Sequence, residues 1–276
     1  MAHSNDDAHA AEYERLTAEL DAHPGTLANQ MMSDVVRAFR AWFQRSQELR
    51  KLLHRGETDA TFQMELMQNV HAPTVREAYT HELDSTLVAY LGAMGALIDI
   101  ARRVAKALPD EFRTEYDARS KVVRAIDGVS LIRDLRNYML HYGVAPWHLS
   151  GTITAEGMTG RVGLASRELL RSSGWNAVSK AYMKKHEVVR LSAIVTPYEA
   201  AMLPLYEWFN EEFYRHKKPD LDAANELVRN VNLHLTGGVT DGQDWPERME
   251  HMQENLRRWK AGEPQTDYET GEPIIE

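Results

Sequence analysis

One short polar segment, residues 133–141, carries the side chains needed to bind and cleave a phosphate ester. On a helix that advances about 100° per residue, Arg133, Asn137 and His141 share one face, and Arg136 lies at its rim. An imidazole can take the proton of a ribose 2′-hydroxyl or protonate the leaving 5′-oxygen. Guanidinium groups can hold the phosphate oxygens, and an amide can orient the phosphate or the imidazole. The segment therefore predicts metal-independent cleavage of RNA, with Arg136, Asn137 and His141 as candidate catalytic residues.

The other face of the same predicted helix is apolar. Its expected core stripe consists of Leu131, Ile132, Leu135, Tyr138, Met139 and Tyr142. Leu140 falls on the polar face, which indicates that a partner covers it, and a second copy in a homodimer would do so. The alternative interpretation is structural: His141 favours the helix C-terminus and caps free carbonyls, while the arginines lie in solvent.

The pattern Arg-Asn-x-x-x-His occurs twice in the chain. The second copy is Arg229, Asn230 and His234, shortly before a glycine pair. Random order of this composition gives the pattern roughly 0.04 times per chain, so the spacing is informative, although a second copy shows that it can also arise for packing reasons. Because the second copy lies in the most acidic third of the chain, we favour the first and keep the second as the alternative site.

Charge is unevenly distributed along the chain. The 276 residues have a net charge of −9, which by itself argues against a polyanionic partner. Residues 113–190, however, hold 13 basic and 7 acidic side chains, and the flanking parts are acidic. Attraction acts over a Debye length of about 8 to 10 Å, so this basic middle can bind RNA phosphates unless it pairs with the acidic flanks. Candidate phosphate-binding residues are Arg133, Lys184, Lys185 and Arg190.

The composition excludes several other kinds of site. Without cysteine there are no disulfides, thiolate zinc sites or cysteine nucleophiles. Gly-x4-Gly-Lys-Ser/Thr and Gly-x-Ser-x-Gly are absent, so we expect no cofactor and no metal. No stretch approaches the ~18 to 20 uncharged apolar residues of a membrane span, and the first residues lack the pattern of a signal peptide. These absences predict a cytoplasmic protein that does not engage a membrane.

Apolar spacing predicts a mainly α-helical protein, a helical bundle with a small β insertion. The expected parts are an N-terminal helical arm (1–25), the bundle (26–145), the β-containing insertion (146–195), C-terminal helices packing on the bundle (196–236) and a polar tail with one short helix (237–276).

Within these parts the element boundaries follow from capping and turn residues. One bundle helix begins at the capping box Thr74 to Glu77, and another spans 109–143 with a break expected at Gly128. A β-hairpin is expected over 147–165 and a third strand over 187–195. Thr196-Pro197 predicts the start of a helix, with a further helix over 220–235 and the short tail helix over 246–260.

Arg136-Asn137-x-x-x-His141, near the end of a long bundle helix, resembles the signature of the HEPN superfamily of helical nucleotide-binding and ribonuclease domains. The resemblance covers residues 26–145 at most. It implies a helical bundle that dimerises, with the motifs of both protomers in one cleft, Arg136 and His141 catalytic, and Asn137 at the polar position after the arginine. It also implies RNA cleavage in toxin–antitoxin or antiviral systems, with an antitoxin or regulatory partner. Because some members bind without cleaving, a non-catalytic helical dimerisation or interaction module that binds protein or nucleotide is the alternative.

Overall fold

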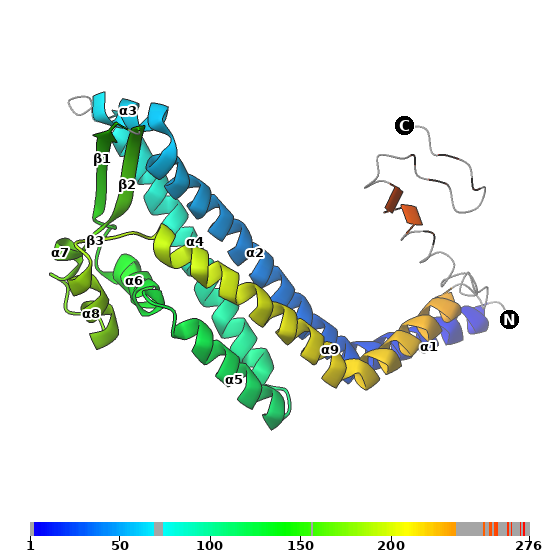
Figure 1. The fold of residues 1–276 in the computed structure, drawn as a ribbon. Helices are drawn as coiled ribbons and strands as arrows, with labels where there is room; N and C mark the ends of the chain where they lie inside the picture. The colour runs from blue at the N-terminus through cyan, green and yellow to red at the C-terminus, as the bar shows by residue number, and fades with distance from the viewer. Residues whose placement is uncertain are drawn as a thin grey trace. The chain divides into compact units, whose positions relative to one another are not determined.

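The computed structural model of the protein describes residues 3–68, 74–155 and 157–235, and isolated positions from 251 onward (Figure 1). The chain forms two compact units. Unit 1 comprises residues 1–28 and 218–276, and unit 2 comprises residues 29–217.

The described residues form a mainly α-helical protein with a small antiparallel sheet, as the sequence predicts. The helices are α1 (His3–Ala22), α2 (Pro24–Thr58), α3 (Ala60–Gln68), α4 (Thr74–Lys106), α5 (Asp110–Arg124), α6 (Val129–His141), α7 (Ser166–Leu169), α8 (Ala177–Lys185) and α9 (Ser192–Leu235). The strands are β1 (Trp147–Thr154), β2 (Gly157–Ala165) and β3 (Val188–Val189), in the order β1-β2-β3.

The core of unit 2 lies between the long helices α2, α4 and α9, which run side by side (Figure 1). The ring of Phe39 in α2 stacks on that of Tyr206 in α9, with centroids 3.6 Å apart. The hydroxyl of Tyr79 in α4 donates to the carbonyl of Leu52 in α2 at 3.0 Å. These contacts join the three helices around side chains that are almost fully buried.

A buried carboxylate fastens α9 to α2. Glu199 is only 6% exposed. Its two oxygens accept hydrogen bonds from Ser46 Oγ at 2.6 Å, Gln47 Nε2 at 2.8 Å and Arg50 Nη1 at 2.6 Å. Burying a charge is costly unless it is paired and hydrogen-bonded, and these three donors from one helix meet that requirement.

Helix α4 is long and apolar enough to cross a membrane, by length and composition alone. This differs from the expectation that no stretch would approach that limit. The side chains that make α4 apolar, including Leu83, Leu87 and Met94, are buried in the core of unit 2. The described structure therefore does not indicate a membrane protein.

The predicted helix over 109–143 is broken where the sequence indicates, at Gly128. This residue has φ 84° and ψ −13° and precedes α6. A side chain here is disfavoured by the left-handed backbone, and a Cβ would also lie 2.6 Å from Ile194 Cδ1. Helix α5 has already ended at Arg124, and Gly128 sets the direction in which α6 begins.

The predicted β-hairpin is confirmed. β1 and β2 pair antiparallel from Trp147 opposite Leu164 to Thr154 opposite Gly157. The indole Nε1 of Trp147 donates to Asp84 Oδ1 in α4 at 2.8 Å, which anchors the hairpin to the bundle.

The predicted strand over 187–195 is largely wrong. Only Val188 and Val189 pair with β2, and α9 begins at Ser192 rather than at Thr196. The amide of Val195 already donates to the carbonyl of Leu191 at 2.8 Å. The apolar cluster that indicated a strand is instead the buried face of a helix, because Leu191, Ile194 and Val195 have i, i+3, i+4 spacing.

The two predicted C-terminal helices are one continuous helix, α9. It runs without interruption from Ser192 to Leu235. An i, i+4 ion pair between Lys218 Nζ and Asp222 Oδ2, 3.0 Å apart, lies where the second helix was expected to begin. Most of the predicted tail helix over 246–260 lies outside the described residues, and its described positions are helical.

Unit 1 contains α1 together with the start of α2 and the end of α9. Arg15 in α1 pairs with Glu12 at 2.8 Å and with Glu19 at 3.0 Å. Gly25 in α2 lies so close to α9 that a Cβ would be 2.0 Å from the carbonyl oxygen of Asp220. The start of α2 and the segment of α9 around Asp220 are therefore in direct contact within this unit.

Candidate functional site

Helix α6 is held by the loop that begins α8. Asn176 caps α8 by accepting a hydrogen bond from the amide of Ser179 at 2.9 Å. The backbone N–H of Asn176 donates to Asp134 Oδ2 at 2.9 Å, and its side-chain Nδ2 donates to Ser130 Oγ at 2.8 Å. One asparagine thus both starts α8 and fixes its position against α6.

The apolar face of α6 agrees only in part with the predicted core stripe. Leu131, Ile132 and Leu135 are buried, and Tyr138 stacks on Trp175 with ring centroids 5.2 Å apart. Tyr142, predicted as core, is 66% exposed. The helix ends at His141, and Tyr142 has left the helical conformation, with φ −123° and ψ −32°. The advance of about 100° per residue therefore no longer predicts the direction of its side chain.

The predicted catalytic residues differ in their surroundings. Asn137 and His141 are exposed, and neither forms a hydrogen bond within the described part of the chain. Arg136 is half-buried, with its guanidinium packed on Gly95 of α4. A Cβ on Gly95 would lie 2.8 Å from both Cζ and Nε of Arg136. The glycine therefore provides the space that this guanidinium occupies.

The Nε atom of Arg136 is buried and has no hydrogen-bond partner. Among the described residues, no carboxylate forms an ion pair with this guanidinium either. A buried donor without an acceptor costs about 1 to 3 kcal/mol, more when it is charged, so an anion bound here would relieve that cost. Arg136 thus has an unsatisfied buried donor, whereas Asn137 beside it and His141 at the end of the same helix are exposed.

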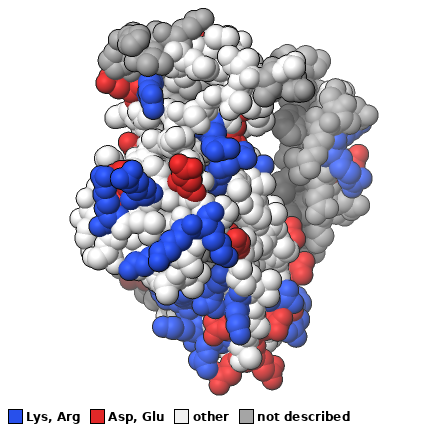
Figure 2. Space-filling model, turned by 60° about the vertical axis from the view of Figure 1, so that its left-hand side comes forward, with Lys and Arg blue, Asp and Glu red and all other residues white. Residues whose placement is uncertain are grey.

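The predicted phosphate-binding residues lie in different settings. Lys184 and Lys185 are exposed in the last turn of α8. Arg190 pairs with Glu57, its Nη2 being 3.3 Å from Oε1, so the fold provides this cation with a carboxylate. Lys and Arg side chains are prominent on the side of the molecule that carries α7 and α8 (Figure 2).

The second copy of the motif lies in unit 1, near the end of α9. Arg229 is exposed and pairs with Glu226 across 3.4 Å. Asn230 is exposed and His234 is half-buried. The pKa of Glu12 in α1 is lowered, chiefly by its hydrogen bond with Arg15 and in small part by the charge of His234. The two copies thus lie in different units, and acidic residues surround the second.

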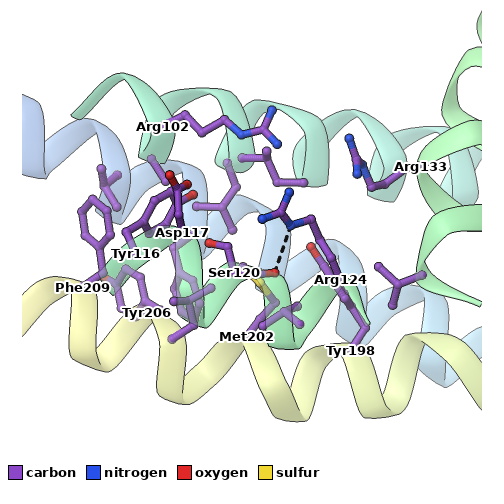
Figure 3. A pocket seen from close by; sticks show the side chains of 18 residues that line it. Arg102, Tyr116, Asp117, Ser120, Arg124, Arg133, Tyr198, Met202, Tyr206 and Phe209 are labelled. Carbon is purple, nitrogen blue, oxygen red and sulfur yellow. Dashed lines mark hydrogen bonds between the residues drawn. The ribbon is translucent and has the colours of Figure 1, made fainter. Parts of the chain in front are cut away.

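A cavity of about 80 Å³ in unit 2 brings Arg133, a predicted phosphate-binding residue, together with two arginines that the sequence did not single out (Figure 3). Its walls come from α2, α4, α5, α6 and α9. Three arginines line it, Arg102 from α4, Arg124 from α5 and Arg133 from α6. Because each arginine comes from a different helix, no local sequence pattern could have brought them together.

The tyrosines of this cavity stay neutral. Burial raises the pKa of Tyr116, while the neighbouring Arg102 and Arg124 oppose this in part. Burial also raises the pKa of Tyr198, against a smaller effect of Arg133. The charge of the cavity near neutral pH is therefore set by its arginines and by Asp117.

Residues 3–68, 74–155 and 157–235 contain no group of three His, Cys, Asp or Glu side chains arranged to hold a metal ion. A scan against protein-family models found no match to the chain, and searches of curated proteins and of solved structures found none either.

Proposed function

We propose that this chain is a metal-independent endoribonuclease whose site comprises Arg136, Asn137 and His141. The observation that carries the proposal is the half-buried guanidinium of Arg136, which packs on Gly95 and has an unsatisfied Nε. A phosphate matches the fork geometry of a guanidinium group, and an imidazole on the same helix supplies the proton transfer. The resemblance of the motif to the HEPN signature supports the same assignment.

In the proposed reaction the imidazole of His141 takes the proton from a ribose 2′-hydroxyl, and the 2′-oxygen attacks the adjacent phosphorus. Arg136 binds the non-bridging oxygens as negative charge builds on them. The bond from phosphorus to the 5′-oxygen breaks, and an imidazolium donates the proton that this oxygen needs. The products are a 2′,3′-cyclic phosphate and a 5′-hydroxyl.

A homodimer would supply both imidazoles, one as base and one as acid. Leu140 supports this arrangement because it is 56% exposed on the face that carries the motif. Two copies of α6 facing each other would bury these leucines and bring both motifs into one cleft. We further propose a cytoplasmic toxin or antiviral effector that acts on RNA and is restrained by an antitoxin or regulatory partner.

Incubation of the purified protein with RNA in EDTA tests the proposal directly. We expect fragments ending in 2′,3′-cyclic phosphate, and His141→Ala to lower the cleavage rate by about 10²- to 10⁴-fold, the usual contribution of general acid–base catalysis. Intact RNA with the native chain, or equal cleavage by the variant, contradicts the proposal.

Two glycines of α4 provide a matched test of how Arg136 is placed. Gly95→Ala puts a methyl group where the guanidinium lies, whereas a Cβ on Gly92, about one turn earlier, would meet nothing within 4 Å beyond the backbone of its own helix. We expect Gly95→Ala to reduce cleavage about tenfold by displacing Arg136, and Gly92→Ala to leave cleavage unchanged. Equal activity of the two variants would show that the position of Arg136 is unimportant.

The alternative is a non-catalytic module that binds RNA or a protein through the same face. One observation favours it: within the described residues, no side chain hydrogen-bonds His141, although a catalytic imidazole is usually oriented by a second group. This function predicts that Arg136→Ala weakens RNA binding in a gel-shift assay while the RNA stays intact with the native chain.

A further inference from the structure

We propose that the cavity lined by Arg102, Arg124 and Arg133 binds a small amphiphilic anion. The anionic head, a carboxylate or a phosphate ester, lies against the arginines, and a short unbranched hydrocarbon end enters the cavity. This ligand site does not include the proposed catalytic residues Arg136, Asn137 and His141. It does use Arg133, which the sequence predicts as an RNA phosphate-binding residue.

The inner wall of the cavity defines the hydrocarbon part of the ligand. Leu97, Val123 and Phe209 are buried side chains that form part of this wall, with Phe39 and Met202 beside them. An apolar cavity of about 150 Å³ holds a benzene molecule, so one of about 80 Å³ holds roughly three or four carbon atoms. An aromatic ring is too large for this space, and the end of an alkyl chain fits it.

The arginines define the head group. Within the part of the chain that the structure describes, the side chains of Arg102 and Arg133 form no hydrogen bond or ion pair. Arg124 uses its Nε to donate to the carbonyl of Ser120 at 3.1 Å. Figure 3 shows the three guanidinium groups on one side of the cavity, with aromatic residues of α5 and α9 on the other.

One carboxylate, Asp117, faces these three cations in the lining. The cavity therefore has a net positive charge in a chain whose overall charge is −9. An anion that bridges two guanidinium groups gains charge-assisted hydrogen bonds, and its apolar end gains burial. Neither a neutral alcohol nor a short anion without a tail obtains both contributions.

Isothermal titration calorimetry of the full chain with four probes tests this proposal. Hexanoate and hexyl phosphate are expected to bind saturably, and the tighter of the two identifies the preferred head. Acetate lacks the tail and hexanol lacks the charge, so each is expected to bind at least about tenfold more weakly, the effect of losing one charged hydrogen bond or two buried methylenes. Absence of hexanoate and hexyl phosphate binding, or equally tight binding of hexanol, overturns the proposal.

Adjacent arginines of α4 give a matched pair of variants. Both Arg102 and Arg103 are exposed, but only Arg102 lines the cavity. We expect Arg102→Gln and Arg133→Gln each to weaken binding of the tighter probe about tenfold, and Arg103→Gln to leave it unchanged. Equal losses in Arg102→Gln and Arg103→Gln would mean that the probe binds through general surface charge, which overturns the proposal. His141→Ala should bind the probe as the native chain does, which separates this site from the ribonuclease site.

Discussion

The same pattern of Arg, Asn and His occurs in α6 and in α9, but the two arginines have different surroundings. Arg136 in α6 is half-buried against a glycine and has a donor without an acceptor. Arg229 in α9 is exposed and pairs with Glu226. An arginine already paired in solvent gains little from binding a phosphate, whereas a desolvated and unpaired one gains much. Desolvation therefore distinguishes two motifs that share the same spacing of Arg, Asn and His.

Replacing the Arg and the His of each copy together is expected to give the largest difference in RNA cleavage rate between the two copies. Replacing Arg136 and His141 by Ala should reduce RNA cleavage in EDTA by about 10²- to 10⁴-fold, since it removes both phosphate binding and proton transfer. Replacing Arg229 and His234 by Ala should leave the rate within about twofold. If the second pair carries the loss instead, the site lies in α9.

Gly128 should give the next largest effect, on the stability of unit 2. Gly128→Ala forces a side chain into a left-handed conformation and against Ile194, at a cost of about 2 to 4 kcal/mol in the free energy of unfolding. Gly143 lies just after the other end of α6, where a Cβ would meet only Tyr138 Oη at 3.8 Å. Gly143→Ala should therefore change the free energy of unfolding by less than about 0.5 kcal/mol. Urea unfolding followed by tryptophan fluorescence measures both, and similar midpoints would contradict the role given to Gly128.

Two asparagines extend the comparison. Asn176→Ala removes the α8 cap and the hydrogen bond to Ser130, so it should lower the free energy of unfolding by about 1 kcal/mol. Asn230→Ala, on the exposed face of α9, should change it by less than about 0.5 kcal/mol. Hydrogen exchange at the first amides of α8 should accelerate only in Asn176→Ala, and exchange unchanged there would exclude the capping role.

The smallest effects are expected from the arginines themselves. Arg136→Met keeps a long apolar stem but removes the unsatisfied buried donor, so stability should rise by about 1 kcal/mol as cleavage is lost. Arg229→Met removes an exposed ion pair and should alter stability by less than about 0.5 kcal/mol. A clear destabilisation by Arg136→Met would mean that the guanidinium is satisfied in the native state.

The elements predicted most accurately from sequence are those with a strong local signal. Gly128 and the hairpin residues are such cases, because turn chemistry acts over a few residues. The start of α9 was misplaced because Thr196-Pro197 is a good capping sequence, yet the buried contacts of Ile194 and Val195 extend the helix before it.

Contacts between distant helices explain what the sequence could not reveal of the sites. Helical spacing placed Arg133, Asn137 and His141 on one face, which agrees with their exposure. The burial of Arg136 depends on Gly95, forty-one residues earlier in another helix. The cavity likewise needs Arg102 and Arg133 to come from separate helices, and single-helix periodicity carries no information about such pairs.

The division of unit 1 between the two ends of the chain has a consequence for biosynthesis. Unit 2 has all its residues once position 217 has left the ribosome, whereas residues 3–28 meet their partners in α9 only afterwards. Because domains fold as their sequence emerges, residues 3–28 must wait until all of unit 2 and the following part of α9 have been translated. The α6 site can therefore form on the nascent chain before unit 1 is complete.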